Sequence, residues 1–237
     1  MIKFKAKMRY TAILFFIFVL TLPSHSQLPK VGFEGAVNIP RVVGSQQFRY
    51  AFSGTYDFQL AATVKLFEGF RAGLGFSYTY FINNPDIFSY KVTSGAAAGA
   101  SVPYDTKFVS QSAFLALKYD RLLSKAIFIS PYLHTGMSFN NYANIYYPDP
   151  KPANTLSPYF NAPWMQVGSC VNFISEKFLS FSVNLGYSLL LQKFNAEVPY
   201  FSEVTEIKYA RNRSIMSWIN IGFGFTIYIP DKSSKKA

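Results

Sequence analysis

Side chains that could perform acid–base or nucleophilic chemistry are few in this chain. One histidine, His134, follows residue 26, and Cys170 is the only cysteine. In an extended segment His134 would share a face with Tyr132 and Ser138, so a histidine-activated serine nucleophile has to be considered. That arrangement needs an acidic residue to orient the imidazole, and none lies near His134 in the sequence. A lone histidine is more often hydrogen-bonded inside a core, and we predict no catalytic residue.

Metal and cofactor sites are not predicted either. One cysteine and one histidine cannot form a clustered ligand set, and the acidic residues are spread along the chain. Two glycine pairs, in Gly73-Leu74-Gly75 and Gly222-Phe223-Gly224, lie inside alternating segments with no helix to follow, unlike a phosphate-binding loop. We expect these glycines to relieve crowding within a sheet.

Five charged residues fall on the polar faces of their segments and could form an ionic cluster. They are Glu34, Asp57, Lys65, Arg71 and Lys118. Isolated charges are costly to bury, whereas charges that pair across an enclosed space are tolerated. We therefore interpret the set as a structural plug of ion pairs rather than as an ion pathway.

The segments that position these residues alternate with period two. From residue 55 to residue 66 the even positions are apolar or aromatic, which is typical of a strand with one apolar face. The pattern resumes after Phe67-Glu68-Gly69 and runs to residue 82, which predicts a hairpin. Similar alternation recurs at 179–191 and 213–229, with weaker segments at about 31–38, 108–120, 126–140 and 163–175. The sequence thus predicts eight strands.

The links between these segments are alternately short and long. Short links lie near 67–70, 120–125 and 175–178, and long ones at 39–51, 83–107, 141–162 and 193–212. Outer-membrane barrels have short periplasmic turns and long extracellular loops in this alternation. We predict an all-β fold, an eight-stranded antiparallel up-and-down transmembrane β-barrel with both chain ends on the periplasmic side.

The strands of a soluble sandwich or a lipocalin-like barrel would show the same alternation. The composition of the polar face therefore has to distinguish these soluble folds from a membrane barrel. That face is mostly Gly, Ser, Thr and Asn, which suit a narrow lumen better than a solvated surface. Charged residues make up only 15% of the chain and aromatic residues 19%, which favours strands in contact with lipid.

The first residues predict export. Basic residues at positions 3, 5, 7 and 9 precede an apolar run at 11–22 and small residues at 24–26, as in a secretory signal peptide. We assign 1–26 to the signal peptide, 27–230 to the barrel and 231–237 to a periplasmic tail. Removal of the four basic residues lowers the formal charge from +11 to +7. The remaining basic residues are scattered, so no nucleic-acid partner is predicted.

Export, eight alternating segments and alternating links together resemble the small outer-membrane barrels of the OmpA/OmpX-like class and the PorT-like "outer membrane protein beta-barrel" group. The resemblance covers residues 31–229 as a pattern. The last segment also resembles the insertion signal of such chains, read here as Asn220, Gly222, Phe225 and Ile227. This implies recognition by the barrel-assembly machinery. Such chains commonly end on an aromatic residue, whereas this one continues through Pro230 into a polar tail.

The long links are the expected contact surfaces, because exposed segments on a rigid scaffold usually carry binding. Tyr146 and Tyr147 precede a proline-rich stretch, and Lys208, Arg211 and Arg213 could contact lipopolysaccharide phosphates. Expected partners are outer-membrane lipid, lipopolysaccharide, the assembly machinery and an envelope protein of unknown identity.

Three functions remain open from the sequence. The first is a non-enzymatic outer-membrane barrel with a structural, adhesion or envelope-complex role, including a secretion-associated one. The second is a narrow barrel that binds or passes a small hydrophobic ligand, in an apolar pocket around Phe81, Phe114, Leu190 and Trp218. The third is a lipid-modifying enzyme centred on His134.

Overall fold

The computed structural model describes residues 28–84, 89–91, 101–103, 107–143, 159–176, 178–194 and 215–230. Eight long strands dominate these residues. They are β1 (Val31–Val42), β2 (Phe52–Phe67), β3 (Phe70–Asn83), β6 (Lys107–Tyr119), β8 (Ile127–Ala143), β9 (Tyr159–Glu176), β10 (Leu179–Leu190) and β11 (Met216–Ile229). The shorter elements are α2 (Gln46–Ala51), β4 (Ser89–Lys91), β5 (Ser101–Pro103) and β7 (Arg121–Leu122).

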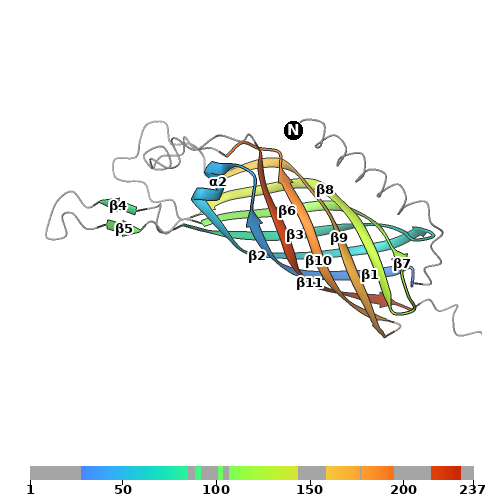
Figure 1. The fold of residues 1–237 in the computed structure, drawn as a ribbon. Helices are drawn as coiled ribbons and strands as arrows, with labels where there is room; N and C mark the ends of the chain where they lie inside the picture. The colour runs from blue at the N-terminus through green and yellow to red at the C-terminus, as the bar shows by residue number, and fades with distance from the viewer. Residues whose placement is uncertain are drawn as a thin grey trace, which may run out of the picture.

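The eight long strands close into a barrel in which every pairing is antiparallel (Figure 1). Each strand pairs with the long strands before and after it in the sequence, and β1 pairs with β11 from Val31↔Ile229 to Val42↔Trp218. Pairing of β6 with β8 completes the circle. The predicted eight-stranded up-and-down barrel is therefore confirmed.

Alternation along each strand separates the lumen from the outer wall. From Ser180 to Ser188 of β10 the buried residues are small or polar, among them Asn184, and the exposed ones are apolar or aromatic, among them Phe181 and Leu185. Glycine at position 69 has φ 71° and closes the tight turn between β2 and β3. The rings of Phe67 and Phe70 stack across that turn with centroids 4.9 Å apart.

Three details differ from the prediction and lie at the loop end of the barrel, where α2, β4 and β5 are found (Figure 1). The first long link begins later than expected, because 39–42 continue β1, and its remainder contains α2. The link between β3 and β6 contains the two-stranded pairing of β4 with β5. A register shift between Gly54 and Tyr56 reverses the alternation in β2, so that Phe52 is buried together with Asp57.

None of the helices formed by the described residues is long and apolar enough to cross a membrane.

Candidate functional site in the barrel lumen

Charged residues fill the turn end of the lumen. Lys118 Nζ lies 3.0 Å from Glu34 Oε2, and Thr63 Oγ1 donates to Glu34 Oε1 at 3.1 Å. Arg71 Nε lies 3.9 Å from Asp120 Oδ2, and Arg71 also donates to the backbone oxygen of Pro29 at 2.9 Å. The side chains of Arg71, Lys118 and Asp120 are almost completely buried. Two ion pairs thus occupy this end of the barrel.

Asp120 is a member of this layer that the sequence did not reveal. It lies in the link after β6, where the sequence predicts an exposed turn. Its carboxyl is instead turned inward and accepts from Ser130 Oγ at 2.7 Å. Burial raises the pKa of this carboxyl, while the nearby charge of Lys118, the Ser130 hydrogen bond and Arg71 act in the opposite direction.

The five charged residues expected in the lumen do not form one cluster. Glu34, Lys118 and Arg71 meet in the turn-end layer, but Asp57 lies farther along β2 and is surrounded by neutral donors. Lys65 is half-buried at the turn end of β2, in register with Arg71.

Asp57 is the centre of a separate, fully buried polar network. Its Oδ2 accepts from the amide nitrogens of Asn38 at 2.9 Å, Gln59 at 2.6 Å and Asn220 at 3.1 Å. Its Oδ1 accepts from Thr79 Oγ1 at 2.7 Å. The donors come from β1, β2, β3 and β11, so one carboxylate joins four neighbouring strands.

His134 lies between aromatic rings rather than beside a nucleophile. Its ring centroid is 4.4 Å from that of Phe114 and 4.6 Å from that of Tyr132, both nearly parallel to it. Ser138 shares the inward face as expected, yet its hydroxyl bonds to Ser110 at 2.8 Å and to Asn140 at 3.0 Å. Within the described residues the arrangement is that of a stacked core histidine, without a serine–histidine pair.

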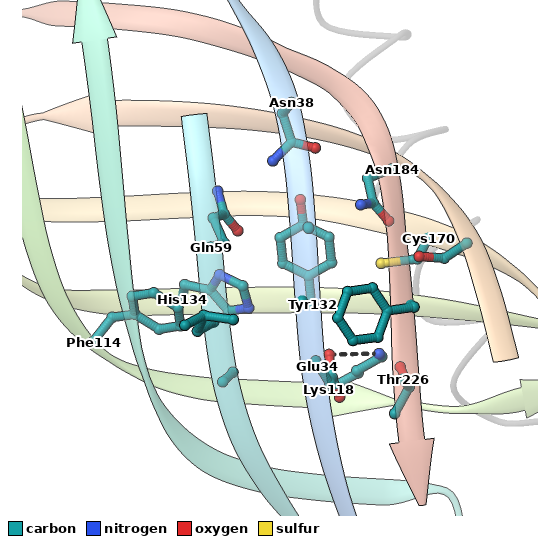
Figure 2. Close-up of a pocket in the computed structure, with 16 residues that line it drawn as sticks. Glu34, Asn38, Gln59, Phe114, Lys118, Tyr132, His134, Cys170, Asn184 and Thr226 are labelled. Carbon is teal, nitrogen blue, oxygen red and sulfur yellow. Dashed lines mark hydrogen bonds and ion pairs between the residues drawn. The ribbon is translucent and has the colours of Figure 1, made fainter. Parts of the chain in front are cut away.

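A cavity of about 40 Å³ lies between the charged layer and the Asp57 network. Figure 2 shows Asn38 and Asn184 at one end of it and the Glu34–Lys118 pair at the other, with His134 at the side beside Phe114. A water molecule needs roughly 10–15 Å³ of such space, so the cavity has room for about three or four. Pockets for organic ligands are several hundred Å³.

An aromatic cluster closes the loop end of the lumen. Phe48 of α2 is fully buried, and its ring centroid lies 5.2 to 5.6 Å from those of Phe52, Phe81, Phe108 and Phe194. The residues expected to line an apolar pocket all belong to the same packed cluster: Phe81, Phe114, Leu190 and Trp218. Phe81, Leu190 and Trp218 fill this part of the lumen, whereas Phe114 also lines the small cavity.

The helix that carries Phe48 was missed in the sequence, although it has a recognisable start. Ser45 is the N-cap of α2, and its Oγ accepts from the backbone N–H of Phe48 at 3.3 Å. With only six residues, α2 is too short to show helical periodicity.

The outer wall is apolar, and aromatic rings mark both of its ends. Tyr56 stacks on Tyr80 with centroids 5.2 Å apart near the loop end, and Phe67 and Phe70 stack at the turn end. Between these bands the described outward positions carry no charged side chain. Phe223 of β11 is 73% exposed there.

Several predicted residues remain outside the described part of the chain. These are the signal peptide, the tail at 231–237 and the candidate loop contacts Tyr146, Tyr147, Lys208, Arg211 and Arg213. The four residues compared with an insertion signal all lie on β11. Asn220 and Gly222 are buried inward, and Phe225 and Ile227 are exposed on the wall.

No protein-family model and no curated protein matches the sequence. Several solved outer-membrane proteins have a similar architecture. Neisserial surface protein A (NspA) aligns with a TM-score of 0.46 and 11% identity over 84% of this chain and 97% of that one. OprG from Pseudomonas aeruginosa gives 0.45 and 10% over 85% and 97%. A major outer membrane protein from Thermus thermophilus gives 0.42 and 11% over 83% and 99%. These likenesses concern the fold and assign no activity.

Proposed function

We propose that this chain spans the outer membrane of a Gram-negative cell as a closed, non-enzymatic and non-conducting barrel. Its role is structural, in adhesion or in an envelope complex, including a secretion-associated one. The observation that carries the proposal is the combination of an apolar outer wall with a lumen filled by side chains along its length.

The apolar wall supports contact with lipid. A closed barrel satisfies every backbone hydrogen bond between strands, which is the condition for strands to cross a bilayer. The eight long strands have 12 to 18 residues, more than the 9–11 or so that a tilted strand needs for the hydrocarbon core. The bands around Tyr56 and Phe67 suit the two interfaces of the membrane.

The predicted signal peptide supports the choice of membrane, and the alternation of short and long links supports the orientation. An exported chain that inserts as a barrel reaches the outer membrane, where the short turns face the periplasm. In that orientation α2 and the long links face outward, and the tail at 231–237 is periplasmic. The assembly machinery and lipopolysaccharide are then the partners met during and after insertion.

The filled lumen supports a function at the loop end of the barrel. Ion pairs at one end and the cluster around Phe48 at the other leave a cavity of only about 40 Å³ between them. A cavity of this size is too small for solutes larger than a few water molecules. We therefore expect binding at the exposed segments.

Conductance across a planar lipid bilayer tests this proposal. The refolded barrel should insert, as shown by its different migration in unheated and heated gels, without the steady current of a water-filled porin. A large stable current from the folded protein would overturn the non-conducting part. Recovery of the native protein from the inner-membrane or soluble fraction would overturn the location.

A second candidate is the binding of a small hydrophobic ligand, and one observation favours it. Pairing between β1 and β2 ends at Asn38↔Asp57, although both strands continue towards the loops. Pro40 lies in the part of β1 that pairs with β11 but not with β2, and it has no N–H to donate. Phe52 is buried at this end of β2, in the cluster with Phe48. An acyl chain entering at this seam would have to displace Phe48.

Quenching of tryptophan fluorescence by a brominated fatty acid tests the second candidate. Trp218 contacts Phe81 in the cluster, with centroids 5.3 Å apart, and is fully buried. Saturable quenching that disappears in Trp218→Phe would support a bound acyl chain. Trp164 belongs to the same cluster, so a Trp164→Phe variant isolates the signal of Trp218. Absence of saturable quenching in Trp164→Phe would remove the candidate.

A further inference from the structure

Arg41 is an exposed charged residue on the outer wall, at the loop end of β1. The alternation of the sequence predicted a link at 39–51, whereas β1 continues to Val42 in the structure. Arg41 therefore follows Val37 and Ile39 on the outward face of the strand, and these two residues are 57% and 66% exposed. Among the described residues none forms a hydrogen bond or an ion pair with its guanidinium. The charge has to be balanced from outside this part of the chain.

Two rows of exposed apolar residues cross β1, β11 and β10 on the turn-end side of Arg41. They are Ile39–Ile221–Leu185 and Val37–Phe223–Val183, each in register from strand to strand. Neighbouring strands lie about 4.8 Å apart and alternate residues about 7 Å apart, so the two rows cover roughly 10 Å by 7 Å between their outer residues. One cation thus lies at the edge of an apolar surface three strands wide.

Arg41 lies at the height expected for the outer membrane interface. Pairing of β1 with β2 ends at Asn38↔Asp57, and Ile39 and Tyr56 are the next residues of the two strands. Tyr56 stacks on Tyr80, in the aromatic band near the loop end. Such bands mark the level of the headgroups, and Arg41 is one outward position farther towards the loops. A charge there faces headgroups rather than acyl chains.

We infer that Arg41 and the two apolar rows form a binding surface for lipid A, the membrane anchor of lipopolysaccharide. The guanidinium binds a phosphate of the lipid through two parallel hydrogen bonds, which is the geometry that arginine favours. The acyl chains lie along the two rows. This inference rests on the proposed function, because that orientation puts the loop end of the barrel in the leaflet that contains lipopolysaccharide.

Charge and shape favour lipid A over a phospholipid. The exposed charged residues described at the loop end are Arg41, Arg49 and Lys193, all of them cationic. Lipid A carries two phosphates on one disaccharide and several acyl chains, whereas a phospholipid has one phosphate and two chains. A cationic rim above an apolar surface three strands wide therefore complements lipid A better.

Native mass spectrometry of the refolded barrel in detergent tests the inference. The probes are bisphosphorylated lipid A, the same lipid without its phosphates, and phosphatidylglycerol. The wild type should retain bisphosphorylated lipid A in a saturable way. The phosphate-free lipid should bind about tenfold more weakly or worse, as expected for the loss of hydrogen bonds to a charged group.

Variants locate the bound phosphate. Arg41→Gln should weaken the binding of lipid A by about tenfold, and Arg41→Lys should recover part of the loss, because lysine keeps the charge without the paired hydrogen bonds. Lys125→Gln is the matched control, since Lys125 is an exposed cation in the link after β7, at the turn end. It should bind lipid A like the wild type. All variants should keep the different migration in unheated and heated gels.

Three binding results would overturn the Arg41 surface. Equal affinity of Arg41→Gln and the wild type would place the phosphate elsewhere. An equal loss in Lys125→Gln would indicate a general attraction to positive charge. Equal retention of phosphatidylglycerol would mean contact with any anionic lipid.

Insertion into lipid vesicles separates this inference from the proposed function. A wild-type barrel that inserts but retains no lipid A would overturn the Arg41 surface and leave the proposed function standing. A wild-type chain that does not insert at all would contradict the proposed function, and the lipid A surface with it.

Discussion

Lys118 Nζ on β6 lies 3.0 Å from Glu34 Oε2 on β1, so this ion pair crosses the lumen between strands that β2 and β3 separate in the wall. A contact of this kind ties opposite sides of the barrel together. It also makes each of the two charges depend on the other for its burial.

Removing one member of the pair should therefore cost more than removing both. Lys118→Met leaves the Glu34 carboxylate without its cation, and we expect a loss of about 3–5 kcal/mol of unfolding free energy. The double variant Glu34→Gln/Lys118→Met should recover most of that loss. Reversible urea unfolding in detergent gives the three values. If the double variant is as unstable as Lys118→Met, the pair is not coupled as the structure indicates.

Phe48 should stabilise the aromatic cluster that closes the loop end of the lumen. Phe48→Ala removes a fully buried ring that contacts four others, and we expect a loss of about 3–5 kcal/mol, the usual range for a buried phenylalanine. Arg49→Ala is the matched control on the same helix, because Arg49 is exposed. The same urea experiment compares them. Equal stability of the two variants would show that the cluster tolerates loss of the ring.

A charge on the middle of the wall should obstruct insertion into lipid. Phe223→Arg replaces a highly exposed residue near the centre of β11, and we expect a cost of about 2–4 kcal/mol in lipid vesicles. Phe67→Arg is the control at the turn end, where the cost should be about 1 kcal/mol or less. The yield of folded protein and its urea midpoint in vesicles measure both. A harmless Phe223→Arg would argue against a lipid-facing wall.

His134 should be dispensable for lipid chemistry. It stacks on Phe114 and Tyr132, and Ser138 bonds to other partners, so His134→Ala should leave the lipid A profile of cells unchanged. Mass spectrometry of extracted lipid A from cells with wild-type protein, the variant and no protein makes the comparison. A lipid A species that requires His134 would establish the enzymatic alternative. Normal amounts of folded variant in the membrane must accompany the result.

Alternation was sufficient to predict the strands and the barrel, because the identity of the lipid-facing and lumen-facing sides repeats at every second residue. It could not predict the loop end. The register shift near Tyr56 changes which alternate residues of β2 face the lumen. Pro40, which is typical of a loop, hides the continuation of β1 to Val42.

The contacts across the lumen could not be predicted from the sequence, for a different reason. Alternation shows that Glu34, Asp57 and Lys118 point inward, but their heights along the barrel depend on the stagger of all eight strands. Glu34 consequently meets Lys118, while Asp57 lies among neutral amides. Asp120, read as part of a turn, proves to be the neighbour of Arg71.

Labelling of single cysteines in intact cells tests the central claim most directly, that a membrane-spanning barrel presents its α2 end outside. In a Cys170→Ser background, a membrane-impermeant maleimide should label Arg49→Cys and Lys193→Cys at the loop end. Ser124→Cys, in the exposed link after β7, should label only after the outer membrane is permeabilised. Labelling of Ser124→Cys in intact cells, or silence of both loop-end sites in a folded protein, would contradict the account.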